Sequence, residues 1–367
     1  MLSNADRRIL HILGQHFYER EFYKLVAQHP ELREGVHHVF LFQGNRAFSV
    51  EECADITIRF SNDRLGSLEK LKLFQSEGKQ ADIIIFHGLW FPKIQLLYAV
   101  QSRIARKSRW VLWGGDLYND LLFPDGGLKA RLKRGIKSKL IKKIEGIIAL
   151  VPGDYAVVKE NYATNSRLYK AFYPLPVNFK LLDRVIAERK PEERRVSTIL
   201  LGNSASKTNE HFEAIDFLTK LSNKEFNVLC PLSYGDMEYA KKVIEYGKTK
   251  LGSRFEPLTE YMKPEDYAKV LNTVDAAIMN HKRQQAVGNI VALLYLGKKV
   301  FLRQEVTTYS WLRDMGITVF DIDEILGAAS DDIFYIEPDK AIANREIIKE
   351  YFSEENCVKL WKRIFDS

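Results

Sequence analysis

Short runs of apolar residues alternate along the chain with longer segments whose apolar residues recur every three or four positions. Short apolar runs are typical of buried strands, and the longer spacing is typical of helices that bury one face. The first half predicts strands at residues 8–13, 38–42, 56–60, 82–87, 110–113, 146–150 and 166–172. It predicts helices at residues 19–27, 67–75, 93–105 and 128–144.

The same alternation begins again in the second half. The apolar runs predict strands at residues 197–201, 226–230, 255–257, 276–280, 299–302 and 318–320. The periodic segments predict helices at residues 209–221, 237–251, 264–273 and 289–296, with a last amphipathic helix at 344–364. Strands that alternate with helices favour parallel sheets covered by helices on both faces, so the predicted class is α/β.

A chain of 367 residues exceeds the size at which one hydrophobic core stops growing, so two domains are expected. The segment Tyr173-Pro174-Leu175-Pro176 disfavours helix and predicts an extended connector. We therefore predict domains at residues 1–176 and 177–343, followed by a helix at 344–367 that packs back onto the first domain. Two Rossmann-like, doubly wound domains facing a central cleft form the GT-B arrangement, whose ligands bind beyond the carboxyl ends of strands.

The cysteine spacing and the apolar segments of the sequence indicate where in the cell the protein is found. The three cysteines are far apart and none forms a C-x-x-C pair, which is typical of a reducing cytoplasm. The N-terminus shows no apolar signal region, and no segment reaches the length of an uncharged membrane span. We therefore expect a cytoplasmic protein whose membrane contact, if it has one, is peripheral.

Residues 128–144 carry eight basic side chains and no acidic one: Lys129, Arg131, Lys133, Arg134, Lys137, Lys139, Lys142 and Lys143. Apolar residues in the same segment follow a helical spacing, so it reads as a basic amphipathic helix. Such a helix suits an anionic membrane surface on the inner face of the cell membrane, or a polyprenyl diphosphate. The alternative is a helix whose basic face is simply solvated. Nucleic acid is not favoured, because no interleaved aromatics or known motif accompany the basic residues.

The predicted strand at 197–201 ends in a loop of small residues, Gly202, Asn203 and Ser204, followed by a predicted helix. Backbone N–H groups at such a turn, together with a helix N-terminus, favour phosphate binding. The loop is therefore a candidate cradle for the diphosphate of a nucleotide or sugar nucleotide. The alternative is an ordinary turn in which Thr208 or Asn209 caps the helix.

The predicted strand at 276–280 leads into a second loop of the same kind. Its candidate donor-binding residues are Arg283, Gln284, Gln285, Gly288 and Asn289. Arginine offers a forked cationic donor, and glycine lets an oxyanion approach the next helix. After the strand at 226–230, Tyr234 is either a platform for a nucleobase or a turn tyrosine.

In the first domain, glycines lie beside titratable residues after three predicted strands. The candidate acceptor-side residues are Gly14, Gln15, Gly88, Gly114, Gly115 and Tyr118. Asp116 is the candidate general base for a sugar hydroxyl, and His87 could share or relay the proton. The alternatives are a helix-capping Asp116 and a hydrogen-bonded wall position for His87.

Other motifs are missing from the sequence. There is no G-x-G-x-x-G after the first strand and no G-x-x-x-x-G-K-[ST], which argues against dinucleotide and P-loop enzymes. The pair Asp321 and Asp323 fits a strand end and a helix cap better than a metal clamp, and no histidines have zinc-ligand spacing. We therefore expect neither a metal nor a cofactor.

Several of these segments together resemble one enzyme family. They are His-Ile-Leu-Gly (11–14), Phe-His-Gly (86–88), Trp-Gly-Gly-Asp-Leu-Tyr (113–118), Tyr-Pro-Leu-Pro (173–176), Gly-Asn-Ser…Thr-Asn-Glu-His (202–211), Pro-Leu-Ser-Tyr (231–234) and Arg-Gln-Gln…Gly (283–288). In this order they resemble the TDP-N-acetylfucosamine:lipid II N-acetylfucosaminyltransferase family of the enterobacterial common antigen pathway. The chain departs from that family at Gly115, where the family has alanine, and in Ala-Val-Gly-Asn (286–289), where it tends to Gly-Ile-Gly-Thr.

The resemblance implies a metal-independent GT-B glycosyltransferase with a TDP-activated 4-amino-4,6-dideoxygalactose donor and a polyprenyl-diphosphate-linked acceptor at the inner membrane face. It implies that the Gly-Asn-Ser and Arg-Gln-Gln loops bind the donor diphosphate and that Asp116 and His87 face the acceptor. A relative acting on another cell-surface polysaccharide fits as well. Two other functions stay open: a GT-B sugar-nucleotide epimerase, and a non-catalytic protein that binds nucleotide sugars or polysaccharide.

Overall fold

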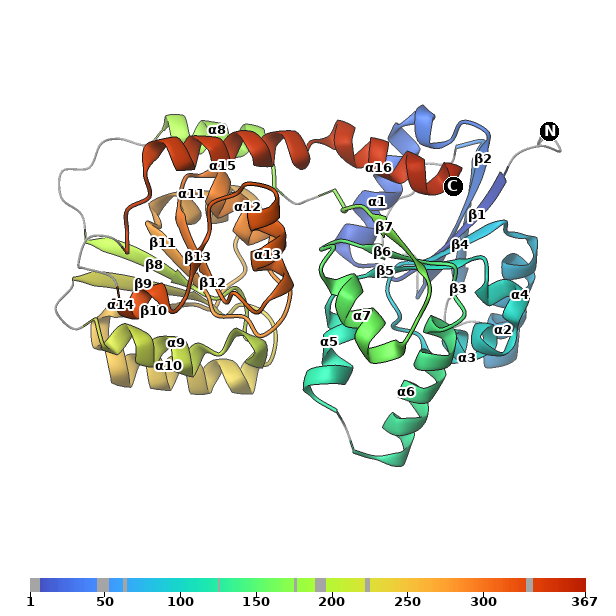
Figure 1. The fold of residues 1–367 in the computed structure, drawn as a ribbon, viewed down its shortest axis with the longest axis horizontal. Coiled ribbons are helices and arrows are strands. Elements are labelled where there is room, and N and C mark those ends of the chain that lie inside the picture. Colours follow the sequence, from blue (N-terminus) through green and yellow to red (C-terminus); the bar gives the residue numbers. More distant parts are fainter. Residues whose placement is uncertain are drawn as a thin grey trace. The chain divides into compact units, whose positions relative to one another are not determined.

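The computed structural model describes residues 7–44, 53–61, 65–124, 126–174, 177–188, 196–221, 225–327 and 333–367. The chain divides into two units (Figure 1). The first unit comprises Met1–Leu175 together with Glu354–Ser367, and the second comprises Pro176–Ser353. Leu175 and Pro176 of the predicted connector lie outside the described residues.

The first unit is built on a seven-stranded sheet in which every pairing is parallel. Its strands are β1 (Arg7–Leu13), β2 (Val36–Gln43), β3 (Ile56–Ser61), β4 (Ile83–Phe86), β5 (Ser108–Leu112), β6 (Gly146–Ala149) and β7 (Arg167–Lys170), in the order β3-β2-β1-β4-β5-β6-β7. Side chains alternate between the two faces of a strand. Leu10 and Ile12 of β1 therefore join the main core of this unit, and the alternate residue His11 faces the other side.

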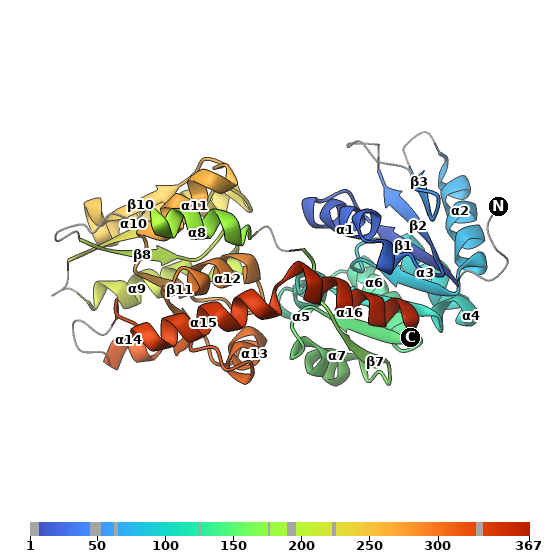
Figure 2. The ribbon, with the colours of Figure 1, turned by 90° about the horizontal axis from the view of Figure 1, so that it is seen from above.

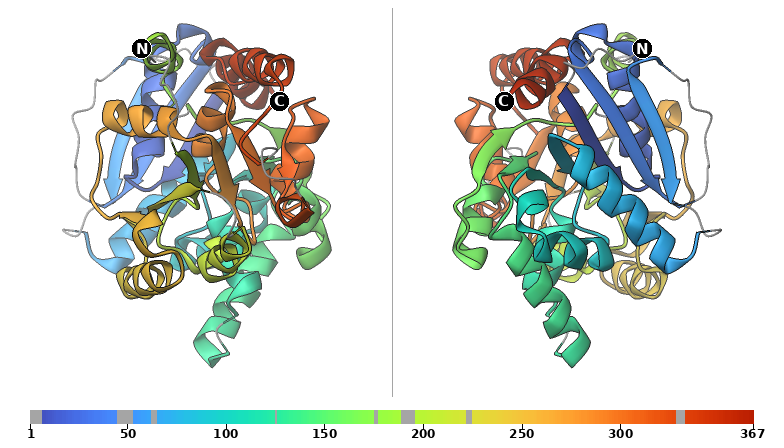
Figure 3. Two further views of the ribbon diagram at one scale, coloured as in Figure 1. Left: turned by 90° about the vertical axis from the view of Figure 1, so that its left-hand side faces the viewer. Right: turned by 90° about the vertical axis from the view of Figure 1, so that its right-hand side faces the viewer.

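Helices cover both faces of the first sheet. They are α1 (Phe17–Gln28), α2 (Ser67–Gln80), α3 (Pro92–Val100), α4 (Ser102–Ala105), α5 (Gly115–Leu122), α6 (Leu128–Ile141) and α7 (Asp154–Tyr162), with a 3-10 turn at Pro30–Leu32. The predicted helix at 93–105 is interrupted at Gln101, whose backbone leaves the helical region with φ −104° and ψ 83°. Figure 3 shows α6 projecting away from the sheet of this unit.

The second unit is built on a six-stranded parallel sheet. Its strands are β8 (Ser197–Leu201), β9 (Phe226–Pro231), β10 (Phe255–Leu258), β11 (Ala276–Met279), β12 (Lys299–Leu302) and β13 (Phe320–Asp321), in the order β10-β9-β8-β11-β12-β13. Each of these strands lies at a predicted apolar run. Their buried residues form the second core.

The helices of the second unit also lie on both faces of its sheet. They are α8 (Phe179–Ala187), α9 (His211–Thr219), α10 (Met237–Leu251), α11 (Pro264–Thr273), α12 (Val287–Tyr295), α13 (Thr307–Asp314), α14 (Glu324–Gly327) and α15 (Pro338–Tyr351), with 3-10 turns at Lys207–Asn209 and Gly252–Arg254. Helices α8, α11, α12 and α15 lie together on one face, as Figure 2 shows from above, and α9 and α10 cover the other. The prediction of an α/β chain with two doubly wound domains is therefore confirmed.

The predicted last segment needs a correction. The helix expected at 344–364 is two helices, because the chain leaves helical geometry at Phe352 and Ser353 and restarts as α16 (Glu354–Asp366). Residues up to Ser353 belong to the second unit, and residues from Glu354 onward belong to the first. The segment that returns to the first unit therefore begins ten residues later than predicted.

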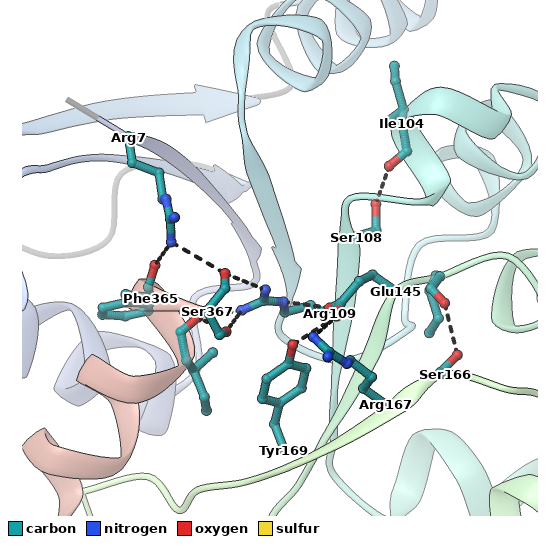
Figure 4. A network of polar contacts seen from close by, with 12 residues as sticks. Arg7, Ile104, Ser108, Arg109, Glu145, Ser166, Arg167, Tyr169, Phe365 and Ser367 are labelled. Carbon is teal, nitrogen blue, oxygen red and sulfur yellow. Dashed lines mark hydrogen bonds and ion pairs between the residues drawn. The ribbon is translucent and has the colours of Figure 1, made fainter. Parts of the chain in front are cut away.

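Polar contacts fix the end of α16 on the first unit (Figure 4). Arg109 of β5 pairs with Glu145 at 2.8 Å, and its guanidinium also donates to the Ile364 and Ser367 carbonyls. Arg7 of β1 donates to the Phe365 carbonyl at 2.6 Å. The last carbonyls of a helix lack intrahelical partners and carry partial negative charge, so two guanidinium groups are suitable partners for them.

Candidate functional site

Both sheets change winding direction next to their first strand, β1 beside β4 and β8 beside β11. Ligands of open parallel sheets bind beyond the carboxyl ends of the strands at this topological switch point. The predicted site loops follow these strands: residues 14–15 after β1, 87–88 after β4, 202–204 after β8 and 280–289 after β11. The fold therefore brings the predicted loops of each unit to the expected edge of its own sheet.

In the second unit, one asparagine joins the two switch-point loops. The Oδ1 atom of Asn209 accepts from the Asn203 backbone N–H at 3.0 Å and lies 3.0 Å from His281 Nε2. Burial lowers the pKa of His281 to about 3, so its ring is neutral and Nε2 carries the proton donated to Asn209. Asn209 is fully buried and holds the loops together. It does not cap α9, because Glu210 occupies the N-cap position.

The loop after β8 differs from the predicted phosphate cradle. Gly202 has φ +68°, and a side chain there would lie 2.7 Å from Asn209 Oδ1, so this position requires glycine. The N–H groups of Gly202 and Asn203 donate to the Ile278 carbonyl and to Asn209. The expectation that these amides point at a phosphate is wrong, because folding of the loop uses them. Helix α9 also begins only at His211, after a 3-10 turn.

A series of hydrogen-bonded polar side chains lies along the same edge of the second sheet. Thr208 Oγ1 donates to Gln285 Oε1 at 2.5 Å, and Gln285 Nε2 donates to Asn203 Oδ1 at 3.1 Å. Asn203 Nδ2 donates in turn to the hydroxyl of Tyr234 at 2.8 Å. The ring of Tyr234 is 56% exposed, so its hydroxyl is fixed while the ring stays accessible. The structure thus brings four predicted residues together in one network, which also places Ser204 in a buried position.

The loop after β11 leads directly into α12. Ala286 has φ +58°, and the first helical hydrogen bond runs from the Ile290 N–H to the Ala286 carbonyl at 3.0 Å. The preceding N–H groups, of Val287, Gly288 and Asn289, are those that a helix leaves without an intrahelical acceptor. The Asn289 side chain donates to the Tyr267 hydroxyl at 3.2 Å. This helix start has the backbone geometry that suits an anion.

Two buried oxygens in the loop after β11 have no hydrogen-bond partner among the described residues. They are Gln284 Oε1, on a residue 7% exposed, and Asn280 Oδ1, on a residue that is fully buried. Asn280 Nδ2 is 3.2 Å from Glu213 Oε2, and Arg303 pairs with the same carboxylate. A buried polar atom without a partner is costly unless a ligand or water satisfies it. Asn280, Glu213 and Arg303 were missed by the sequence prediction, although Asn280 ends a predicted strand.

In the first unit, three buried histidines form a chain across neighbouring strands. His11 of β1 lies 2.9 Å from His38 of β2 and 3.0 Å from His87 after β4, measured between ring nitrogens. His38 Nε2 is 2.9 Å from the Leu32 carbonyl, and His87 Nδ1 contacts the Tyr173 hydroxyl. A carbonyl can only accept, so His38 carries its proton on Nε2, and the same assignment follows for His11 and His87. Tyr173 donates the last hydrogen bond.

Burial keeps this chain neutral. It lowers the pKa of His38 to about 4 and that of His87 to about 3, and it lowers the pKa of His11 well below its ordinary value. Trp361 of α16 stacks on His87 with 18° between the rings. Because both nitrogens of His87 are engaged and its ring is fully buried, the interpretation of His87 as a proton relay to substrate is wrong. The alternative, a hydrogen-bonded wall position, describes it.

Asp116 is likewise an internal residue. Its Oδ2 accepts from the Leu89 N–H at 2.9 Å and from Trp110 Nε1 at 2.7 Å, and its Oδ1 accepts from the Trp113 N–H at 3.0 Å. Burial raises the pKa of this carboxyl, and nearby Lys137 opposes that shift. The carboxylate is 4% exposed. It therefore ties the loops after β4 and β5 together, and the assignment of Asp116 as the base for an acceptor hydroxyl is corrected.

The other acceptor-side predictions have different outcomes. The ring of Tyr118 lies in the main core, and its hydroxyl donates to Asp154 at 2.7 Å, so this residue does not face a substrate. Gly14 is buried, and its N–H donates to Glu19 at 2.8 Å. Gln15 follows it, and its buried Nε2 has no hydrogen-bond partner among the residues that the structure describes. Gly114 has φ +80° and precedes α5, which Gly115 begins.

Among the described residues, no group of three or more histidine, cysteine, aspartate or glutamate side chains is arranged to hold a metal ion. The three-histidine chain fits this finding, because its ring nitrogens bond to one another. Along the described helices, none combines the length and the apolar character needed to span a bilayer.

The two parallel-sheet units, with their first strands at a switch point, define a GT-B glycosyltransferase fold. Residues 8–363 match the family described as 4-alpha-L-fucosyltransferase glycosyl transferase group 56. The chain therefore belongs to glycosyl transferase group 56, and it is a glycosyltransferase. This result supports the resemblance found in the sequence as far as a fucosyltransferase-type glycosyltransferase family.

Several solved structures share the fold at low sequence identity. A glycosyltransferase from Rickettsia africae is 14% identical with a TM-score of 0.66, and the match covers 98% of each chain. Sucrose-phosphate synthase from Thermosynechococcus elongatus is 13% identical with a TM-score of 0.67, over 98% of this chain and 99% of that one. An Anabaena protein in complex with UDP and glucose is 14% identical with a TM-score of 0.62, over 98% of each chain.

Proposed function

We propose that this enzyme transfers a deoxyamino sugar from a TDP-sugar to a polyprenyl-diphosphate-linked saccharide in the synthesis of a cell-surface polysaccharide. The donor sugar in the proposal is 4-acetamido-4,6-dideoxygalactose or a close relative. The observation that carries the proposal is the start of α12, where an open helix N-terminus follows Arg283 and the unpartnered Gln284 Oε1. The sequence resemblance supplies the nucleotide and the sugar.

In this proposal the donor diphosphate binds at the start of α12. The leaving diphosphate gains negative charge as the glycosidic bond breaks, and the positive end of a helix dipole together with a guanidinium stabilises that charge. The Arg283 side chain already folds over this loop, where its Nη1 donates to the Gln284 carbonyl at 2.8 Å. These groups supply the positive charge without a metal. The exposed ring of Tyr234 lies at the same sheet edge and would stack on the nucleobase.

The acceptor side of the proposal rests on α6. Leu128 is 84% exposed and Leu132 is 66% exposed, and basic residues such as Lys129 and Lys133 flank them. An apolar stripe beside basic side chains is the composition of a helix that lies in a membrane interface. We propose that α6 docks peripherally on the anionic cytoplasmic face of the cell membrane, where a lipid-linked acceptor would be found.

Calorimetric titration with TDP tests the donor site. Arg283→Ala is expected to weaken TDP binding at least tenfold, because a charge-assisted contact to phosphate is lost. Arg313→Ala is the matched control, since it removes the same charge from an exposed position at the end of α13. Unchanged affinity in Arg283→Ala would place the diphosphate elsewhere.

A turnover assay with a TDP-sugar separates transfer from its alternatives. Transfer requires the lipid-linked saccharide, whereas an epimerase would change the sugar without it. Tight binding of nucleotide sugar with no turnover would indicate a non-catalytic protein. Activity that survives EDTA is expected.

A further inference from the structure

The loop after β4 presents one exposed indole at the switch-point edge of the first sheet. Trp90 is 42% exposed, whereas Trp110, Trp311 and Trp361 are buried. It follows His87 and Gly88, so it lies beside the point where the sheet changes direction between β1 and β4. The sequence prediction passed over this residue, because a single tryptophan in a loop has no periodic signal.

Two glycines lie directly against this indole. A side chain at Gly88 would lie 2.0 Å from Trp90 Nε1, and one at Gly115 would lie 3.3 Å from Trp90 Cη2. Gly88 also has φ +96°, a conformation that other residues rarely adopt. The two ends of the ring system therefore rest on the loops after β4 and β5, which accounts for both glycines.

The backbone beside Trp90 is fixed from both directions. The Leu89 N–H donates to Asp116 at 2.9 Å, and the Leu89 carbonyl accepts from Gln95 Nε2 at 2.9 Å. Asp116 and Gln95 are both about 96% buried, at 4% exposure each. Two residues earlier, the His87 N–H donates to the Ile12 carbonyl at 2.9 Å. A buried acid and a buried amide thus fix the backbone that carries this accessible aromatic ring, and the ring lies against two glycines.

We propose that Trp90 is a stacking platform for a pyranose ring of the acceptor saccharide. This inference rests on the proposed function and names the part of the acceptor that the first unit recognises. The apolar C–H face of a pyranose packs on an aromatic face, and its hydroxyls stay available to water and to polar groups. A platform that is rigid before binding loses little conformational entropy when the sugar arrives. Asp116 and Gln95 are then positioning residues for the platform.

Indole NMR tests the platform without any need for turnover. The chain has five tryptophans, so the 15N-labelled protein gives five indole N–H signals, and Trp90→Phe assigns the one from Trp90. Titration of the full chain with N,N′-diacetylchitobiose is expected to shift the Trp90 signal in a saturable way. No shift of that signal, or a shift confined to other tryptophans, would overturn the proposal.

Acceptor kinetics provide the second readout. Trp90→Ala is expected to raise the KM for the lipid-linked saccharide about tenfold or more and to leave the KM for the TDP-sugar unchanged, while Trp90→Phe keeps an aromatic face and restores most of the loss. Tyr261→Ala removes an aromatic ring that is 82% exposed in the second unit and serves as the matched control. An unchanged acceptor KM in Trp90→Ala would overturn the proposal.

The two experiments separate this inference from the proposed function. If the wild-type enzyme shows no transfer to any lipid-linked saccharide, the proposed function fails, and the NMR titration still decides the platform. If Trp90→Ala instead weakens binding to vesicles of anionic phospholipid and leaves the acceptor KM unchanged, Trp90 is a membrane anchor and the platform proposal is wrong.

Discussion

The two units have the same strand order around their switch points. They differ in how the polar side chains at those points are hydrogen-bonded. In the first unit, His87 and Asp116 bond to internal partners with every nitrogen or oxygen of their side chains, and of the predicted site residues there Gln15 alone has a buried side-chain atom without a partner among the described residues. In the second unit, Gln284 Oε1 and Asn280 Oδ1, in the loop that leads from β11 to α12, are buried without a partner in the part of the chain that the structure describes. Topology thus marks the place for a site, and the local hydrogen bonds decide whether a polar residue there can contact a ligand.

Among the single substitutions, the largest expected effect comes from removing the internal carboxylate of the first unit. Asp116→Ala leaves the Leu89 N–H, the Trp113 N–H and Trp110 Nε1 without an acceptor, so we expect a loss of about 3 to 5 kcal/mol of unfolding free energy. Urea unfolding measures it. Glu160→Ala removes a carboxylate from an exposed position of α7 and should cost less than about 1 kcal/mol. An Asp116→Asn enzyme with native stability and no transfer would instead restore Asp116 as the base.

The equivalent change in the second unit affects both stability and binding. Asn209→Ala removes the acceptor for the Asn203 N–H and His281, and we expect about 2 to 3 kcal/mol of destabilisation together with weaker TDP binding. Urea unfolding and calorimetry measure the two effects. Asn227→Ala, at an exposed position of β9, is the control and should change neither. Native TDP affinity in Asn209→Ala would show that the joined loops are not the donor site.

Acid is expected to destabilise both units through their buried histidines. Folded pKa values of about 4 for His38 and His211 and about 3 for His87 and His281 lie below the unfolded value of 6.5, so the unfolded chain binds more protons as the pH falls. Stability is fully present above pH 6.5 and is lost as the pH falls from 6.5 toward 4 and 3, by about 1.4 kcal/mol per pH unit for each histidine.

Urea unfolding at pH 7 and pH 5, followed by tryptophan fluorescence, measures this slope. Trp361 stacks on His87 and therefore reports on the first unit. Equal stability at the two pH values would show that burial does not lower the pKa values of these histidines in the folded protein.

The smallest effect on stability is expected at the surface of α6. Leu132→Gln changes a residue that is 66% exposed, so the unfolding free energy should stay within about 0.5 kcal/mol. The fraction of protein that co-sediments with anionic vesicles should fall several-fold. High salt should lower it further, because the attraction to the headgroups is screened. Leu68→Gln, 65% exposed on α2, is the matched control. Equal loss in the two variants, or no loss, would favour a solvated α6.

The sequence predicted most of the fold, because buried parallel strands are short apolar runs that can be recognised one at a time. It missed α5, α7, α8 and α13, whose segments are short or follow glycine and proline, and it joined α15 to α16. It also located the four switch-point loops, since these follow the strands directly. The sequence could not show which hydrogen-bond partner each polar atom in those loops has.

The sequence by itself determined where strands end, and so beyond which strands Gly88, Asn203 and Gly288 lie, because a strand is encoded locally in its own residues. Tertiary structure alone decided that His87 bonds to His11 and Tyr173, that Asp116 bonds to three internal donors, and that Trp90 rests on two glycines. The physical reason is that each of these contacts joins residues from different strands and loops, and burial and hydrogen bonding depend on the packed neighbours.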